Sequence, residues 1–403
     1  MITQGARAPA TLGLGGPLAR GLLLGAVAGV IWAASRKRAG PPPALIDWER
    51  AGSTAKSISS QELDWDGPVA VVNQELAGRY ASWVRQSADL IGRYVGEDVI
   101  AHDDAIFAFD RRQWIEANLS GFRILFEPLE RINREIIHDG TVGSAVVAGA
   151  SRVVLSSELG ILIGYLSRRV LGQYDLALLG REPLTNGVGG RLYFVEPNIA
   201  RLQARLDLDA DEFRLWIALH ETTHAYEFEN HPWVRDYMNG LLGRYFDSLS
   251  EDLLGIRKSP GGGLDFVQRV GGNLIRGGSA IDAIMNLEQR AIFGQLQALM
   301  CLLEGYSNHV MDQVGSKLLS SYPMMKARFD ERNRNKSFAE RLFARLTGLD
   351  MKQEQYILGE RFVSEVVRQR GIGFANRAWE GPAALPTIEE VREPALWIAR
   401  MGG

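Results

Sequence analysis

The sequence has 403 residues, of which 46% are hydrophobic and 23% charged, and its formal net charge is −3. These values are typical of a folded globular protein and exclude a disordered or fibrous chain. The small net charge gives no reason to expect a polyanionic partner, so we do not expect nucleic acid binding. A single cysteine, Cys301, lies in an apolar run and is expected in the core. It excludes an intramolecular disulfide and a thiolate cluster, so any metal must be held by His, Asp or Glu.

Residues 1–44 form the first predicted unit, an apolar segment followed by a proline-rich linker. Residues 20–35 carry one charge, at their first position, and three cations follow directly. We expect this segment to contact a membrane as an anchor that tethers the following domain to the inner face, because the three cations favour a cytoplasmic location of that domain. A cleaved secretion signal and a disordered leader are the alternatives. The prolines at 41–43 predict a stiff linker.

The second predicted unit, residues 45–403, is mainly helical, because apolar residues recur in most segments at three- and four-residue spacing. Its clearest early helices are residues 74–95, 113–134 and 155–171. Two short runs rich in aromatic and branched residues, 105–109 and 191–195, predict the strands of a small β-sheet. The glycine-rich residues 258–279 predict a surface loop, which is either a lid or a passive connection.

A well-delimited helix is predicted to begin after Asp209. Asp209 and Glu212 have the spacing of a capping box, and Pro232 disfavours helical geometry at the preceding residue. The helix should therefore end near residue 229 or 230. Large apolar residues flank its middle on most sides, so we expect it to be buried, and polar groups within it then need partners.

The middle of this helix reads His-Glu-Thr-Thr-His from residue 220 to residue 224. Positions four apart on a helix are offset by about 40°, so His220 and His224 point the same way and can hold one ion. Glu221 is rotated by about 100° and can sit beside the ion as a general base toward a metal-bound water. Imidazole ligands with an open coordination position favour zinc.

A catalytic zinc usually has a third protein ligand, and three residues are candidates. Glu304 is the strongest, because it is a lone carboxylate within the apolar helix predicted over 296–310, where a charge is costly unless it is paired. An ion pair with an arginine is the alternative reading of Glu304. His231 lies one position later than the third histidine of the H-E-x-x-H-x-x-G-x-x-H pattern, whose glycine is Glu227 here. His309 could bind zinc through its imidazole, but nothing about its position in the sequence indicates a ligand.

Two stretches, HETTHAYEFENHPW and LLEGYSNHVMD, resemble a bacterial family of zincin-like metallopeptidases whose physiological role is unassigned. Further similar stretches lie at 110–114, 170–175, 196–198 and 385–387. The likeness runs from about residue 46 to residue 401. It implies a mainly helical zincin-like domain with a small sheet, with His220, His224 and Glu304 as zinc ligands and Glu221 as the catalytic carboxylate.

The resulting hypothesis is a zinc-dependent metallopeptidase that hydrolyses a peptide or amide carbonyl by Glu221-assisted attack of water, with a peptide or protein as substrate. Tyr306, Tyr226 and His309 are candidates for an additional donor to the oxyanion. One alternative is a catalytically degenerate, membrane-tethered interaction protein that binds zinc for structure. Another is a zinc amidase or similar hydrolase that acts on a small molecule.

Overall fold

The computed structural model describes residues 44–60, 72–102, 105–136, 142–175, 190–258, 285–334 and 349–402. The apolar segment 20–35 and the prolines at 41–43 lie outside these ranges, as does nearly all of the glycine-rich stretch 258–279. Within the described ranges, no helix combines the length and apolar character needed to cross a membrane.

The described chain is mainly helical, with one small sheet, as predicted. Its first half contains α2 (Trp48–Ser60), α3 (Gln74–Val95), β1 (Ile106–Phe109), α4 (Arg111–Leu125), α5 (Glu127–Ile136), α6 (Val142–Ser167), β2 (Gly172–Asp175), β3 (Arg191–Val195) and α7 (Glu196–Arg205). Its second half contains α8 (Ala210–Ala225), a π-helix η2 (Tyr226–Asn230), α9 (Trp233–Lys258), α12 (Leu287–Leu318), α13 (Tyr322–Arg334), α15 (Leu349–Arg370), α16 (Ile372–Ala375), η3 (Asn376–Trp379), η4 (Pro382–Ala384), α17 (Ile388–Arg392) and α18 (Pro394–Gly402).

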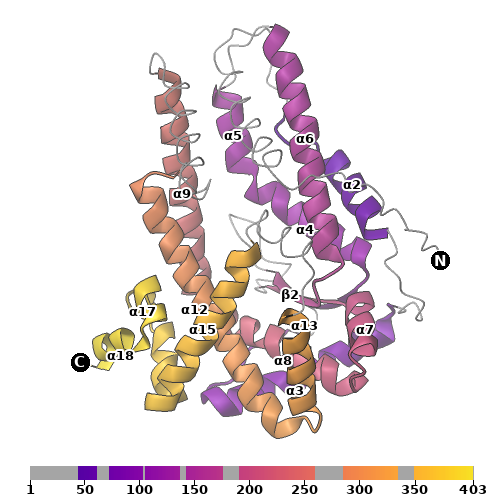
Figure 1. The fold of residues 1–403 in the computed structure, drawn as a ribbon, viewed down its shortest axis with the longest axis vertical. Helices are drawn as coiled ribbons and strands as arrows, with labels where there is room; N and C mark the ends of the chain where they lie inside the picture. Colours follow the sequence, from indigo (N-terminus) through magenta and orange to yellow (C-terminus); the bar gives the residue numbers. More distant parts are fainter. Residues whose placement is uncertain are drawn as a thin grey trace, which may run out of the picture.

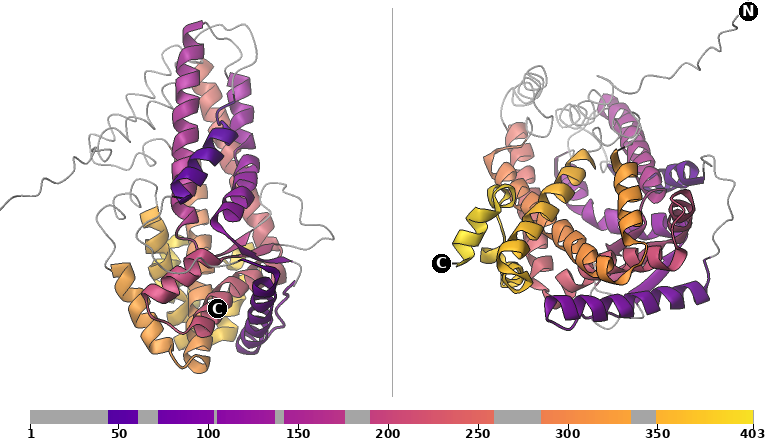
Figure 2. Two further views of the ribbon diagram at one scale, coloured as in Figure 1. Left: turned by 90° about the vertical axis from the view of Figure 1, so that its right-hand side faces the viewer. Right: turned by 60° about the horizontal axis from the view of Figure 1, so that its bottom comes forward.

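The molecule is elongated, and its helices divide into two regions (Figure 1). Helices α5, α6 and α9 extend to one end, and the left view of Figure 2 shows them standing side by side there. The sheet and helices α3, α8, α12 and α13 lie toward the other end (Figure 1). The predicted metal-binding helix, α8, is therefore in the more compact region.

The sheet has the strand order β1-β3-β2, with β1 parallel and β2 antiparallel to the central strand β3. Alternate residues of β3 face two different cores, because successive side chains on a strand point to opposite sides. Leu192 and Phe194 join the large core that contains α3, α8 and α12. Tyr193 and Val195 join the smaller core with α2, α4 and α6. This burial on both faces explains why β3 was recognisable as a continuous apolar run.

Helix α12 is the central support of the large core, in contact with both α8 and α15. Two glycines allow α12 and α15 to approach closely: a Cβ added at Gly305 would lie 2.1 Å from the backbone carbonyl carbon of Gly359. Cys301 is fully buried on α12, as predicted. This close backbone contact fixes the position of α12 along and about its own axis relative to α15, next to Glu304.

Two predicted helices differ from the structure. The helix predicted over 113–134 is two helices, α4 and α5, separated at Phe126. Pro128 explains the break, because it has no backbone N–H to donate to the carbonyl of residue 124 and its ring clashes with that carbonyl. The helix predicted over 155–171 begins earlier and ends at Ser167. The Asn198 side chain donates hydrogen bonds to the carbonyl oxygens of Ser167 and Val170 beyond that end, at 2.8 and 2.7 Å.

Strand β2 was not predicted, although β1 and β3 were. Its sequence, Gly-Gln-Tyr-Asp, has little hydrophobic alternation, and all four residues are half-buried. The strand forms because it pairs with β3, with Gly172 opposite Phe194 and Asp175 opposite Arg191. This pairing is not local in the sequence, so no short window could indicate it.

A buried ion pair attaches α8 to α7. Arg214 on α8 pairs with Glu196 at the start of α7, and the second oxygen of Glu196 accepts from the Tyr80 hydroxyl at 2.5 Å. Glu196 and Arg214 are both buried. We expect Glu196→Ala to lower the free energy of unfolding by about 3 kcal/mol, because it leaves a buried guanidinium uncompensated. Denaturant titration of the variant measures this loss.

The control for this prediction is an exposed ion pair on the same helix. Asp211 pairs with Arg79 at 2.5 Å, and both side chains are more than half exposed. Exposed pairs contribute little, so Asp211→Asn should cost less than about 1 kcal/mol. Equal losses in the two variants would contradict the assignment of Glu196 and Arg214 as a buried structural pair.

Candidate metal centre

Helix α8 begins at a capped residue, as predicted. The Asp209 carboxylate accepts from the backbone N–H groups of Asp211 and Glu212, at 3.0 and 2.8 Å. The Glu212 side chain does not complete a capping box. It accepts instead from the N–H and hydroxyl groups of Ser320 and Ser321, which follow α12. The start of α8 is therefore attached to the end of α12, the helix that carries Glu304.

The helical region ends at Asn230, in agreement with the prediction from Pro232. Its last turn, Tyr226–Asn230, is a π-helix rather than an α-helix. Single π-helical turns inside α-helices occur frequently at functional sites. This turn begins two residues after His224 and carries two acidic residues, Glu227 and Glu229, which contact different parts of the site.

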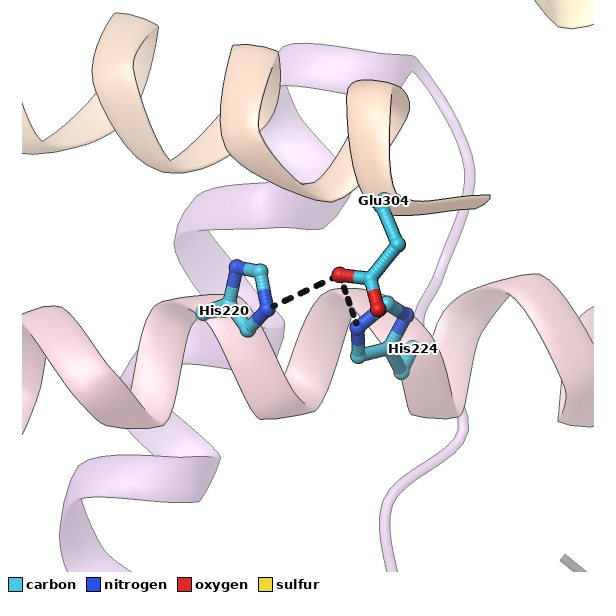
Figure 3. A group of neighbouring side chains, drawn as sticks. All are labelled: His220, His224 and Glu304. Atoms are coloured by element: carbon cyan, nitrogen blue, oxygen red, sulfur yellow. Dashed lines mark ion pairs between the residues drawn. The ribbon is translucent and has the colours of Figure 1, made fainter. Parts of the chain in front are cut away.

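The structure brings together His220, His224 and Glu304. Nε2 of His220 lies 3.7 Å from Oε2 of Glu304, and Nε2 of His224 lies 3.8 Å from the same oxygen. The imidazole centroids are 4.8 Å apart. Figure 3 shows the Glu304 side chain reaching from α12 toward both histidines on α8. The potential ligand atoms of the three residues all lie within 4.8 Å of one another.

These distances fit a shared metal ion better than direct hydrogen bonds. A charge-assisted N–H···O bond is about 2.7–2.9 Å long, well below the observed 3.7 and 3.8 Å. Two ligand atoms bound to one tetrahedral zinc at about 2.0–2.1 Å are about 3.3 Å apart. Glu304 is only 4% exposed, so its carboxylate needs a cation close by. The donor set of two imidazoles and one carboxylate suits zinc.

Glu227 orients one of the two histidines. Its Oε2 is 2.7 Å from Nδ1 of His224, which leaves Nε2 of that ring directed toward Glu304. Glu227 is fully buried. A carboxylate on the far nitrogen of a metal-binding histidine fixes the ring and its tautomer. In the sequence Glu227 departs from the glycine of the H-E-x-x-H-x-x-G-x-x-H pattern, and its spacing of three residues from His224 on a helix favours this contact.

The charge balance at the centre favours a cation. Burial lowers the pKa of the His224 imidazole, but the carboxylates of Glu227, Glu304 and Glu221 outweigh it, and the net pKa is raised. Burial raises the pKa of Glu227. The neighbouring His224 lowers this pKa and the Glu304 carboxylate raises it, and the net shift is upward. Both shifts arise because three carboxylates meet two imidazoles in a poorly solvated space. A divalent cation would balance this excess negative charge.

Glu221 lies next to the ligand cluster, and its side chain contacts strand β2. Its side chain is nearly buried, at 7% exposure. A Cβ added at Gly172 would lie 2.5 Å from its Cγ and Oε1 atoms, so the backbone of β2 touches this carboxylate directly. Apart from its place in the stretch 170–175, nothing in the sequence indicated that Gly172 lies near the site. Only the pairing of β2 with β3 brings it to Glu221.

The two alternative histidines lie outside the cluster. His231 stacks on Trp379, with ring centroids 5.5 Å apart, and burial lowers its pKa to about 4. His309 is a core residue whose nitrogens lie 2.8 Å from the Tyr94 hydroxyl and 3.0 Å from the Ser364 hydroxyl. Neither histidine belongs to the metal-binding group found among the described residues.

The tyrosines considered as oxyanion donors are also engaged elsewhere. Tyr306 donates to Oδ1 of Asn376 at 2.6 Å, and Tyr226 donates to Oε2 of Glu97 at 3.4 Å. Both rings are fully buried. The physical reason is helical phase: each lies two positions after a cluster residue and is thus rotated by about 200° from it. In this structure the side chains of Tyr306, Tyr226 and His309 therefore bond to residues outside the metal-binding group.

The contact between Glu227 and His224 makes a testable prediction. Glu227→Gln should weaken zinc binding about 10- to 100-fold, because a neutral amide holds the imidazole less well than a carboxylate. Competition with a chromophoric chelator measures the affinity. Glu229→Gln is the matched control, since Glu229 lies in the same π-helical turn but accepts from Tyr174 of β2. Unchanged affinity in Glu227→Gln would contradict the orienting role.

Comparison with known proteins gives a family and one solved structure. The family model for zincin-like metallopeptidases matches residues 46–398. A crystal structure from Chloroflexus aurantiacus, described as a candidate hydrolase with a novel fold, is 40% identical with a TM-score of 0.64. The match covers 89% of this chain and 99% of that chain. No match is found among curated proteins. The chain therefore belongs to the family of zincin-like metallopeptidases.

Proposed function

We propose that the protein is a zinc-dependent peptidase in which His220, His224 and Glu304 hold the metal and Glu221 is the general base. The observation that carries this proposal is the buried Glu304 carboxylate, 3.7 and 3.8 Å from the Nε2 atoms of the two histidines. Family membership supports metal-dependent hydrolysis as the class of reaction.

A zinc ion bound at this centre supplies a Lewis acid that lowers the pKa of water and polarises a carbonyl group. The chain contributes the proton transfers and the geometry. Glu221 accepts a proton from the attacking water and can return it to the departing amine. Glu227 holds the His224 ring so that Nε2 faces Glu304. The low exposure of Glu221 and Glu304 limits competing water and strengthens the electrostatic interactions.

The position of β2 supports a peptide rather than a small molecule as substrate. Among the described strands, β2 lies at one edge of the sheet and pairs with β3 only. All four of its residues are half-buried rather than fully covered. An extended peptide can add to such an edge through main-chain hydrogen bonds. Because Gly172 touches Glu221, a peptide bound along β2 would pass the general base.

The first experiment measures bound zinc and then cleavage of a peptide library. We expect about one zinc per chain, and cleavage that stops on chelation and returns when zinc is added. Zinc binding without cleavage of any peptide, together with unfolding on chelation, would favour the structural, degenerate reading instead. Cleavage of small amides alone would favour the small-molecule hydrolase.

A further inference from the structure

We propose that Gly172 is a positioning residue that keeps the Glu221 carboxylate in its working orientation; this rests on the proposed role of Glu221 as general base. A Cβ at residue 172 would lie 2.5 Å from Cγ and Oε1 of Glu221 and 2.7 Å from Cδ. Such separations are well inside van der Waals contact. The backbone φ of Gly172 is not in the left-handed region, so this contact, and not backbone strain, would penalise a side chain here.

The sheet register explains why residue 172 faces α8. Gly172 pairs with Phe194, whose side chain belongs to the large core that contains α8. Side chains alternate along a strand, so residues 172 and 174 share this face. Tyr174 accordingly stacks on Phe228 of the π-helical turn, with parallel rings 5.6 Å apart. The Gln173 side chain points to the opposite side.

Side-chain and backbone contacts hold β2 in place against α8. Oε1 of Gln173 accepts from Nε1 of Trp114 at 2.7 Å, and Oδ2 of Asp175 accepts from the Tyr193 hydroxyl at 2.9 Å. The Tyr174 hydroxyl donates to Glu229. The strand is thus attached on both faces, in addition to its pairing with β3. A side chain added at Gly172 would therefore displace the flexible Glu221 carboxylate rather than the strand.

The same arrangement accounts for two stretches that the metal site itself does not use. Residues 110–114 supply Trp114, which bonds to Gln173, and Arg111, whose Nε donates to Oδ1 of Asn198 at 2.8 Å. Residues 196–198 supply Asn198, which donates to the carbonyl of Val170 just before β2. These stretches converge on β2 and fix the approach of its first residue to Glu221.

The kinetic test is Gly172→Ala in the zinc-loaded protein, with a peptide identified by the library screen. We expect kcat to fall about 10- to 100-fold, since a displacement of about 1 Å at a reacting group can cost this much. KM and zinc content should stay within twofold of wild type. Gly294→Ala on α12 is the control, because an added Cβ there meets nothing within 4 Å, and its kcat should be unchanged.

A second test does not depend on activity. Melting temperatures are measured for wild type, Gly172→Ala, Glu221→Ala and the double variant, all at the same zinc concentration. Gly172→Ala should lower the melting temperature of the wild type but not that of Glu221→Ala, which lacks the crowded atoms. Such non-additivity reports direct contact between the two residues.

The outcomes separate this proposal from the proposed function. If Glu221→Gln is inactive but Gly172→Ala has wild-type kcat and additive melting temperatures, the positioning role alone is overturned. If Glu221→Gln remains active, the general-base assignment fails and takes the positioning role with it. Loss of kcat in Gly172→Ala together with non-additive melting temperatures supports the proposal.

Discussion

Glu221→Gln is expected to bind zinc normally and to lose hydrolysis by roughly 10²- to 10⁴-fold, the usual contribution of a general base. Glutamine has nearly the same size and preserves the packing against Gly172, but it cannot accept a proton from water. Zinc content by elemental analysis and kcat on a cleaved peptide are the two measurements. They must be made on the same preparation, so that loss of metal and loss of the base are told apart.

The control for Glu221→Gln is Asp211→Asn, which removes an exposed carboxylate from the same helix and should leave kcat unchanged. Near-wild-type activity in Glu221→Gln would remove Glu221 from the mechanism. Loss of zinc from Glu221→Gln would instead mean that this carboxylate is a ligand, and the assignment of Glu304 would need revision.

Glu304→Gln is expected to abolish the stabilisation of the protein by zinc. At a zinc concentration 100 times the dissociation constant, wild type should gain about 2.7 kcal/mol in unfolding free energy. A variant with hundredfold weaker binding should gain less than about 0.5 kcal/mol at the same concentration. Thermal unfolding with and without zinc measures both values. The physical reason is the loss of the only anionic ligand in the proposed set.

The metal-free proteins distinguish ligand loss from misfolding. Without a cation, Glu304→Gln should keep the folded far-UV circular dichroism spectrum of wild type, because glutamine has nearly the same size as the buried glutamate that it replaces. Glu288→Gln, at the exposed start of α12, is the control and should respond to zinc like wild type. Full zinc stabilisation in Glu304→Gln would contradict its role as ligand and would call for the same test on His231→Ala.

Local sequence rules predicted the helix that carries the two histidines. The Asp209 cap and Pro232 set its limits, and a repeat of 3.6 residues per turn puts His220 and His224 on one face. Helix α3 was predicted with its observed ends, and β1 and β3 were recognisable from their composition. In each case the signal lies within a few consecutive residues.

Contacts distant in sequence were less predictable. The isolated charge of Glu304 in an apolar helix suggested a partner, but an ion pair with an arginine remained open until the packing of α12 on α8 brought it to the histidines. Strand β2 was missed because its short, polar sequence forms a strand only when it pairs with β3. Tyr306 and Tyr226 were considered as oxyanion donors because their chemistry was suitable, yet their helical phase directs them into the core.

The sequence by itself determined the chemistry that is available: two imidazoles one helical turn apart, a carboxylate beside the first, and no thiolate alternative. The tertiary structure decided which distant groups join them. Glu304 reaches the histidines because α12 packs on α8, and Gly172 meets Glu221 because of the register of β2. The physical reason is that spacing along a helix is set by backbone geometry, whereas contacts between elements depend on how their side chains pack.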